Sequence, residues 1–466
     1  MKVQYGSDIT HEGYKTQRYQ LARVCDYLMD SSDRVCVLYG LRRTGKSVII
    51  LQAIRWLMDE KGVAPSDILL VTGEDTGFDV MSDLYEQLDA FEGQYIFIDE
   101  VAYFNDFIES AAQLYDHYTF LKRKKIVTAG TNLASIFVAR LSTLFDRTVA
   151  IRMHHLTFYE HCRLVLKKDS PSQQDLTDYL KNGGLFSPVN SNDYLQSSIV
   201  DHLDSTLLGG PARQLYSWID SSKYADIGWR GILNNLCLYS AGNINNSVLA
   251  KVNSLRDDVQ HLKRGMPELE INSALLQAFR DYYDIPKSAG NAMKQDEAIG
   301  LIRFLTDCGF LLRLDNIVDD APQGDRSKCY LTFPFMRYAF TEHLAELLGI
   351  KDRTERSALI GNMLEGCAVS EYRLAYPNAP LFFWREKLND RVEECDLVES
   401  YCKELLPSAA SGAAYEIKLT HDPGYSGLHA LRTAHPEYEI AQYQKLEGEE
   451  VMRFIYGLGA KAYAAL

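Results

Sequence analysis

The sequence predicts an α/β protein whose N-terminal part is a parallel sheet with helices on both faces. Two observations carry this prediction. Over residues 1–165, short apolar runs alternate with helix-like segments, an order typical of parallel sheets. Residues 40–47 read Gly-Leu-Arg-Arg-Thr-Gly-Lys-Ser, a phosphate-binding pattern that connects a strand to a helix.

The alternation can be divided into individual elements. Apolar runs bounded by polar residues predict the strands, and apolar positions at helical spacing predict the helices. The expected strands cover 35–39, 67–72, 95–98 and 126–129, and the expected helices cover 14–29, 46–59, 80–91 and 104–118.

Composition excludes several classes of protein. The 466 residues are 46% hydrophobic and 24% charged, which is globular and excludes a disordered chain, a collagen-like fibre and a membrane bundle. The start, MKVQYGSDIT, has no apolar core of a signal peptide, and no apolar run approaches the ~18 residues of a membrane span. The nine cysteines form no CxxC pair, so we expect reduced thiols in a cytoplasmic protein. A formal net charge of −14 means that any contact with nucleic acid needs a local basic patch.

The phosphate-binding loop is the strongest functional signal. Its glycines and the start of the following helix let backbone N–H groups approach phosphates. Lys46 is expected to reach the β- and γ-phosphates, and Ser47 to ligate Mg²⁺. The expected ligands are therefore ATP and Mg²⁺, bound by Gly40, Arg42, Arg43, Thr44, Gly45, Lys46 and Ser47.

An acidic pair follows a later strand, in Tyr95-Ile-Phe-Ile-Asp99-Glu100. Asp99 is expected to hold Mg²⁺, and Glu100 to orient and deprotonate the attacking water. The strand expected over 67–72 lies between this strand and the phosphate loop. An acidic pair after an intervening strand is typical of P-loop proteins that hydrolyse ATP with a glutamate.

Further polar residues follow the pair. Thr131 and Asn132, at the end of the strand over 126–129, either sense the γ-phosphate or belong to a simple turn. Arg147 and Arg152 are each a candidate arginine finger, acting in the same chain or across a subunit interface, or a solvated arginine.

These motifs resemble the archaeal-type AAA ATPase family. The resemblance rests on GLRRTGKS, YIFIDEV, IVTAGTN and LTFYEH, and it extends over essentially the whole chain. Two positions depart from the family pattern, which usually has Pro where this chain has Leu41 and Gly where it has Asp146. The second departure leaves the role of Arg147 open.

A second candidate site lies in the last quarter of the chain. Strands are expected over 380–385, 392–398 and 414–419, and a helix over 359–371. Asp396 and Glu416 could bind Mg²⁺ or Mn²⁺, Lys418 could orient a bound water, and Glu365 could support the metal or the water. The alternative is an ordinary solvated strand face.

The same stretch resembles the uncharacterised C-terminal domain that commonly follows this type of ATPase. That domain is similar to restriction-endonuclease-like folds of the PD-(D/E)XK type, with Cys395 and Leu397 as packing changes here. Residues 238–252 and 296–316 resemble the family's winged-helix segment, which binds DNA or links domains. Near-neutral charge over 292–307 argues against strong phosphate binding.

The expected organisation is therefore a P-loop AAA-type domain over 1–165, a helical linker over 166–225, a winged-helix-like domain over 226–345 and a nuclease-like domain over 346–466. One hypothesis is an ATPase whose nucleotide state controls a metal-dependent nuclease acting on nucleic acid. The second is an ATP-dependent switch whose inactive nuclease fold binds a protein or DNA. A non-hydrolysing scaffold is disfavoured by Glu100. A homo-oligomer is compatible with Arg147 and Arg152, and no membrane contact is expected.

Overall fold

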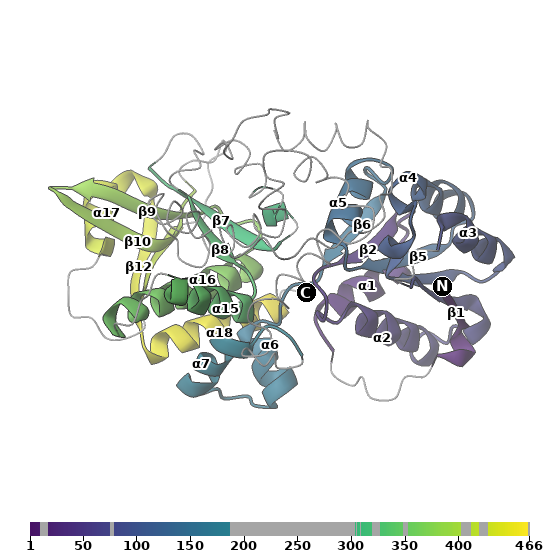
Figure 1. The fold of residues 1–466 in the computed structure, drawn as a ribbon, viewed down its shortest axis with the longest axis horizontal. Coiled ribbons are helices and arrows are strands. Elements are labelled where there is room, and N and C mark those ends of the chain that lie inside the picture. The colour runs from purple at the N-terminus through teal and green to yellow at the C-terminus, as the bar shows by residue number, and fades with distance from the viewer. Residues whose placement is uncertain are drawn as a thin grey trace.

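The structure is a computed structural model. It describes residues 1–9, 17–74, 79–186, 303, 305–307, 309–318, 327–347, 353–401, 412–418 and 427–464. The described elements form two bodies, each built on its own sheet (Figure 1). The expected segment over 238–252, part of that over 296–316 and the linker beyond residue 186 lie outside the described residues.

The N-terminal sheet has the strand order β1-β3-β4-β5-β2-β6 in the described chain. All neighbours are parallel except β1, which pairs antiparallel with β3 at one edge. The strands are β1 (Lys2–Tyr5), β2 (Val35–Tyr39), β3 (Ile68–Thr72), β4 (Tyr95–Asp99), β5 (Lys125–Gly130) and β6 (Thr148–Arg152). This agrees with the expected strands and adds β1 and β6.

The strand that lies between the acidic pair and the phosphate loop along the chain does not lie between them in the sheet. The segment Ile68–Thr72 precedes β4 in the chain, but in space β5 is the strand between β4 and β2. The polar residues after β5 therefore stand between the phosphate loop and the acidic pair.

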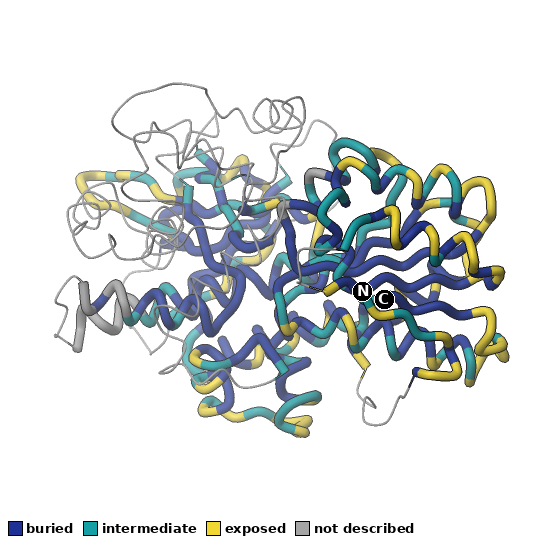
Figure 2. The backbone as a smooth tube through the Cα atoms, turned by 45° about the vertical axis from the view of Figure 1, so that its right-hand side comes forward, coloured by how far each residue is buried: buried dark blue, intermediate teal, exposed yellow. Residues whose placement is uncertain are grey.

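Helices cover both faces of this sheet, and its strands are buried (Figure 2). On one face, α1 (Gln20–Met29) and α2 (Lys46–Asp59) pack against apolar side chains of the strands in a single core. The other helices are α3 (Met81–Ala90), α4 (Phe107–Ser110), the π-helix Leu114–Leu121 and α5 (Leu133–Leu141).

Two expected helices differ from the observed ones. Helix α1 begins at Gln20 rather than near residue 14, because the preceding Arg18 makes buried contacts outside the helix. The helix expected over 104–118 is broken. A short α4 starts after Asp106, whose carboxylate accepts from Met81 N and Ser110 Oγ, and the chain then continues as a π-helix.

The C-terminal sheet has the order β12-β11-β10-β9-β7-β8 in the described chain. Strands β9, β10 and β11 are antiparallel neighbours, and β12 runs parallel to β11. The strands are β7 (Leu311–Asn316), β8 (Lys328–Leu331), β9 (Leu381–Leu388), β10 (Arg391–Glu399), β11 (Gly412–Lys418) and β12 (Ile440–Glu447). Strands β7 and β8 form a hairpin inside the segment expected as a winged-helix-like domain, and β7 also pairs parallel with β9. The sheet thus extends across the boundary expected at residue 345.

The helices of this body are α6 (Phe158–Glu160), α7 (Gln173–Asn182), α15 (Pro334–Leu347), α16 (Arg353–Ala375), α17 (Gly427–Ala434) and α18 (Glu449–Ala464). Helices α16 and α18 share one core with the sheet, and α17 packs in a second core on the other side. Helices α6 and α7 precede most of this body in the chain but pack beside α15 and α18 (Figure 1). No helix in the described ranges is long and apolar enough to cross a membrane.

Candidate functional sites

The phosphate loop connects β2 to α2 in a conformation that requires glycine. Gly45 has φ +92°, in the left-handed region that side chains rarely adopt. A Cβ on Gly40 would lie 2.4 Å from the carbonyl oxygen of Met153. The Thr44 hydroxyl donates to Leu41 O at 2.8 Å, which closes the loop on itself.

Lys46 is buried at the start of α2. Its ammonium donates to the carbonyl oxygens of Gly40 (2.9 Å) and Leu41 (2.8 Å), both within the loop. Burial lowers the pKa of Lys46 to about 8, against the opposing effect of Glu100 and Asp99. The loop carbonyls thus hold a cation that could move to an incoming phosphate.

The acidic pair lies at the carboxyl end of β4, facing the loop. Burial raises the pKa of Asp99, whose carboxylate accepts a hydrogen bond from the hydroxyl of Ser47. A hydroxyl and a carboxylate in contact are hard oxygen donors of the kind that Mg²⁺ takes in nucleotide sites, so these residues fit that ion. Burial also raises the pKa of Glu100.

Glu100 is held by the strand that lies between β4 and β2. Its Oε2 accepts from the hydroxyl (2.9 Å) and the backbone N–H (3.2 Å) of Thr131. Its backbone has φ +55°, an uncommon conformation for a side-chain-bearing residue. Asn132 instead caps α5, because its Oδ1 accepts from Ser135 N at 3.0 Å.

The four candidate arginines differ in their position relative to the phosphate loop. Arg42 donates to the hydroxyl of Tyr103, and Arg43 has a left-handed backbone with φ +65°. Arg152 ends β6 beside Tyr39, so it lies near the loop. Arg147 precedes β6 and binds Asp116, while its carbonyl accepts from Val35 N at the start of β2. Because the loop follows the other end of β2, Arg147 does not reach a phosphate bound by its own chain.

The second candidate site is an acid site formed by Glu365, Asp396, Glu416 and Lys418. Glu365 comes from α16, Asp396 from β10, and the other two from β11. Leu397 pairs with Tyr415, so Asp396 and Glu416 are the next residues along paired strands. The register with β9 shifts between Cys395 and Val398, a bulge of the kind that redirects a side chain.

The acid site is buried and charged. All three carboxylic side chains are buried, and Lys418 lies 3.3 Å from Glu416 Oε1. Asp396 Oδ2 accepts from Ile417 N at 2.8 Å. Burial and the neighbouring Glu365 raise the pKa of Asp396, against the opposing effect of two lysines.

One of those lysines, Lys328 of β8, stands among the acids. Its ammonium lies 2.7 Å from Glu365 Oε1 and 3.9 Å from Asp396 Oδ1, and it also pairs with Glu394. Carboxylates suit Mg²⁺ or Mn²⁺ chemically. However, no group of three or more His, Cys, Asp or Glu in the described residues is arranged to hold a metal. While the Lys328 ammonium lies among them, these carboxylates leave no position for the metal expected at Asp396 and Glu416.

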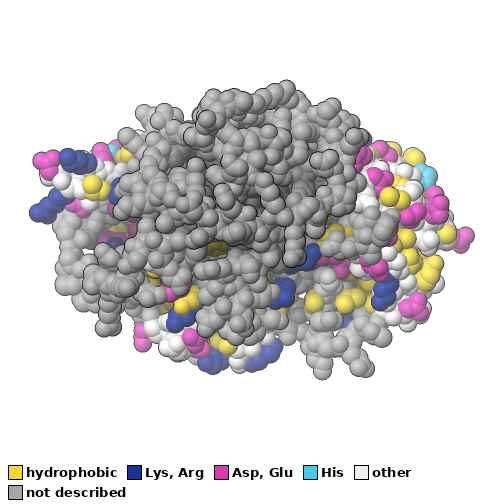
Figure 3. Space-filling view, viewed as in Figure 1, with side chains coloured by type: hydrophobic (Ala, Val, Ile, Leu, Met, Phe, Trp, Pro, Cys, Tyr) yellow, Lys and Arg dark blue, Asp and Glu magenta, His cyan; other side chains and the backbone are white. Residues whose placement is uncertain are grey.

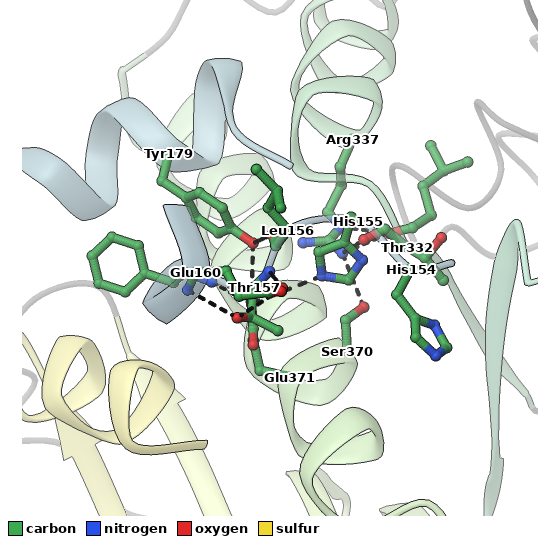
Figure 4. Close-up of polar contacts among 12 residues, drawn as sticks. His154, His155, Leu156, Thr157, Glu160, Tyr179, Thr332, Arg337, Ser370 and Glu371 are labelled. Carbon is green, nitrogen blue, oxygen red and sulfur yellow. Dashed lines mark hydrogen bonds and ion pairs between the residues drawn. The ribbon is translucent and has the colours of Figure 1, made fainter. Parts of the chain in front are cut away.

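The segment after β6 is joined to α16 of the C-terminal body. The Glu371 carboxylate of α16 accepts from Phe158 N (2.9 Å) and the Tyr179 hydroxyl (3.0 Å) (Figure 4). His155 Nε2 lies 3.8 Å from the same oxygen. Glu371 is six positions beyond Glu365 on one helix, so α16 reaches both this junction and the acid site.

A cavity of about 350 Å³ lies between the bodies. Gly40 and Leu41 of the phosphate loop line one side. Thr332 and Phe333, which directly follow β8, line another. The two residues whose carbonyls hold Lys46 and the two residues that follow β8 therefore border the same space.

Residues 32–162 match the AAA domain family. The matched residues include β2 to β6 and the phosphate loop, and the match supports a P-loop AAA ATPase fold for this body. With its phosphate loop, this AAA domain indicates an ATPase-type function that uses a nucleotide and Mg²⁺.

A curated relative from Haemophilus influenzae, an uncharacterised protein, is 26% identical over 248 residues. The match covers 51% of this chain and 56% of that protein, so it spans about half the length of each.

Solved structures are similar at a low level. The Aeropyrum pernix ORC1 protein in complex with DNA has 14% identity and a TM-score of 0.23, covering 71% of this chain and 93% of that one. The Saccharomyces cerevisiae Hsp104–ADP complex has 13% identity and a TM-score of 0.27, covering 74% and 47%. Likeness at this level says nothing about the activity of this chain.

Sequence reasoning missed three residues of these sites. Lys328 is buried in the short strand Lys-Cys-Tyr-Leu. A lysine in so apolar a strand could have been recognised from the sequence as a buried charge that needs acidic partners. Arg18 and Glu371 are also buried, but neither belongs to a local pattern. Both became visible only when distant segments were brought together.

Proposed function

We propose that this chain is an ATP-hydrolysing protein whose nucleotide state controls the acid site of its C-terminal body, a metal-dependent nuclease-like domain acting on nucleic acid. The observation that carries the first half is the convergence of Lys46, Ser47, Asp99 and Glu100 at one edge of the AAA sheet. The half-buried carboxyl of Glu100, whose pKa is raised by burial, suits the role of general base.

Each residue of the nucleotide site has its own role in ATP hydrolysis. Lys46 leaves the carbonyls of Gly40 and Leu41 and pairs with the β- and γ-phosphates. Ser47 and Asp99 would hold Mg²⁺, which neutralises phosphate charge. Glu100, positioned by Thr131, takes the proton of the attacking water. Arg147 is available only to a nucleotide on another subunit, which makes a homo-oligomer part of the proposal.

The cavity between the phosphate loop and the C-terminal body supports control of the acid site by the bound nucleotide. When Lys46 moves to a phosphate, Gly40 and Leu41 lose the ammonium that now binds their carbonyls. These residues border the same cavity as Thr332 and Phe333, directly after β8. A change in the loop can therefore reach the strand that carries Lys328.

ATP turnover with Mg²⁺ tests the first half of the proposal. Lys46→Ala is expected to abolish phosphate release, while Lys61→Ala, at an exposed lysine after α2, is expected to leave it unchanged. Equal turnover by the original chain and Lys46→Ala contradicts the assignment of the phosphate loop.

Cleavage tests the second half. Plasmid, linear and single-stranded DNA and RNA are incubated with Mg²⁺ or Mn²⁺, with and without ATP, beside Asp396→Ala. We expect cleavage that depends on ATP and is lost in the variant. If Asp396→Ala still cleaves, the acid site is not the nuclease centre.

A second candidate function is an ATP-dependent switch whose nuclease fold binds a protein or DNA without cutting. The specific observation in its favour is Lys328, which neutralises the acids from within. On the face of the molecule drawn in Figure 3, acidic and basic side chains are interspersed wherever the described surface is visible. ATP turnover without cleavage under any condition is the outcome that selects this function.

A further inference from the structure

Lys328 occupies the middle of the acid site rather than its rim. Its side chain is only 9% exposed, and its ammonium pairs with Glu365 and Glu394. The same ammonium lies 3.9 Å from Asp396 Oδ1, so it faces three carboxylates. The residue is therefore a charged ammonium among carboxylates.

We propose that Lys328 is the resident cation of the acid site and competes with a divalent metal ion for Glu365 and Asp396, so that the site is closed to metal while this side chain is in place. The inference rests on the proposed nuclease-like function, because it names the residue that regulates that site. It also explains why the acids, although suitable in type, are not arranged around a metal position.

The ligand oxygens are already in use. Glu365 Oε1 accepts hydrogen bonds from both the Lys328 ammonium and the Tyr330 hydroxyl. Asp396 Oδ2 accepts from Ile417 N, and its Oδ1 faces Lys328. A hard cation needs several of these oxygens at short distance, so it cannot enter beside the ammonium without like-charge repulsion.

The backbone of Lys328 is fixed to the helix that carries Glu365. The buried guanidinium of Arg337 donates to Leu331 O at the end of β8 and to Met363 O of α16. A Cβ on Gly366 would lie 2.7 Å from the Tyr330 ring, so α16 lies close against β8. Opening therefore has to come from the side chain of Lys328, a flexible four-carbon stem, and not from separation of strand and helix.

Metal affinity of the full-length chain tests this directly, without any cleavage assay. Mn²⁺ is titrated into the nucleotide-free chain and into Lys328→Met, which removes the charge and keeps an unbranched side chain one atom shorter. We expect Lys328→Met to bind Mn²⁺ on the order of tenfold more tightly or better, the size of effect that neighbouring charged groups have on metal sites. The gain is expected to disappear in Lys328→Met combined with Asp396→Ala.

The matched control is Lys125→Met. Lys125 is also only 9% exposed and also binds an acid, Asp30, but it lies in the AAA domain. It is expected to leave Mn²⁺ affinity unchanged. A folded Lys328→Met chain with unchanged or weaker Mn²⁺ affinity overturns the proposal, and so does an equal gain in the control.

Uncompensated carboxylates could prevent Lys328→Met from folding. In that case Mn²⁺ is expected to restore the folded chain, measured by circular dichroism, and a chain that stays unfolded at saturating Mn²⁺ overturns the proposal. The proposed nuclease function fails independently of this result. If Lys328→Met binds Mn²⁺ more tightly but the original chain never cleaves nucleic acid, the role of Lys328 stands and the nuclease function is rejected. If the original chain cleaves with ATP but Lys328→Met has unchanged Mn²⁺ affinity, the nuclease function stands and the role of Lys328 is rejected.

Discussion

At the scale of single residues, Glu100 is the most constrained group of the AAA domain. Its backbone is left-handed, its carboxylate is held by Thr131, and burial raises its pKa. Strain and a raised pKa at one residue are typical of a functional position rather than of a structural one. Asp99 next to it differs, because its carboxylate accepts from the hydroxyl of Ser47 in α2 rather than from Thr131.

Glu100→Gln is expected to separate ATP binding from ATP hydrolysis. The amide keeps the size of the side chain but cannot take a proton, so turnover is expected to fall by about 10²–10⁴-fold. Nucleotide affinity is expected to remain, because Lys46 and the loop are unchanged. Phosphate release and nucleotide binding are measured on the same preparation, beside Glu109→Gln, an exposed control in α4. Full turnover by Glu100→Gln would remove Glu100 from the mechanism.

At the scale of elements, the sequence predicts best what depends on neighbours in the chain. The strand Val35–Tyr39, the loop and the helix Lys46–Asp59 form one contiguous unit, and all three were predicted. The contact of Lys328 with Glu365 depends instead on the packing of β8 against α16, which Arg337 fixes through Leu331 O and Met363 O. Nothing in a local pattern sets that packing. The four predicted residues of the acid site came together, but the cation among them was missed.

Helix α7 offers a test at the same scale. Ser172 and Asp175 form a capping box, with Asp175 Oδ2 accepting from Ser172 N at 2.8 Å. Asp175→Asn is expected to lower the local free energy of opening of α7 by about 1 kcal/mol at neutral pH. Hydrogen exchange of the α7 amides measures it, with the exposed Asp178→Asn on the same helix as control.

The effect of Asp175 has a defined pH range. Hydrogen bonds from Lys168, then from Ser172, lower the pKa of Asp175 to about 2, below its ordinary 3.8. A lowered acid pKa stabilises the folded chain above the unfolded value, and this stabilisation is lost as pH falls through the folded value. The difference between Asp175→Asn and the original chain should therefore shrink between pH 4 and pH 2. A difference that stays constant over that range contradicts the role of the carboxylate.

At the scale of the whole molecule, Arg18 connects the two bodies. Its guanidinium donates to both carboxylate oxygens of Glu160 in α6, at 3.0 and 2.9 Å. It also donates to the carbonyl of Thr44 in the phosphate loop and to those of His154 and His155. One buried side chain thus contacts the nucleotide loop, the segment after β6 and the first helix of the C-terminal body.

Removing Arg18 is expected to separate the unfolding of the two bodies. Arg18→Met leaves the fully buried Glu160 without its cation, a change that costs about 3–5 kcal/mol. We expect a single cooperative urea transition of the original chain to become two transitions, observed by fluorescence and circular dichroism. The combined variant Arg18→Met and Glu160→Gln should recover part of the loss, because no unpaired buried charge remains. Arg34→Met, at an exposed pair with Asp146, should cost at most ~1 kcal/mol and leave the transition single. A single transition in Arg18→Met, with stability close to that of Arg34→Met, would show that the bodies are joined by their apolar contacts and not by this ion pair.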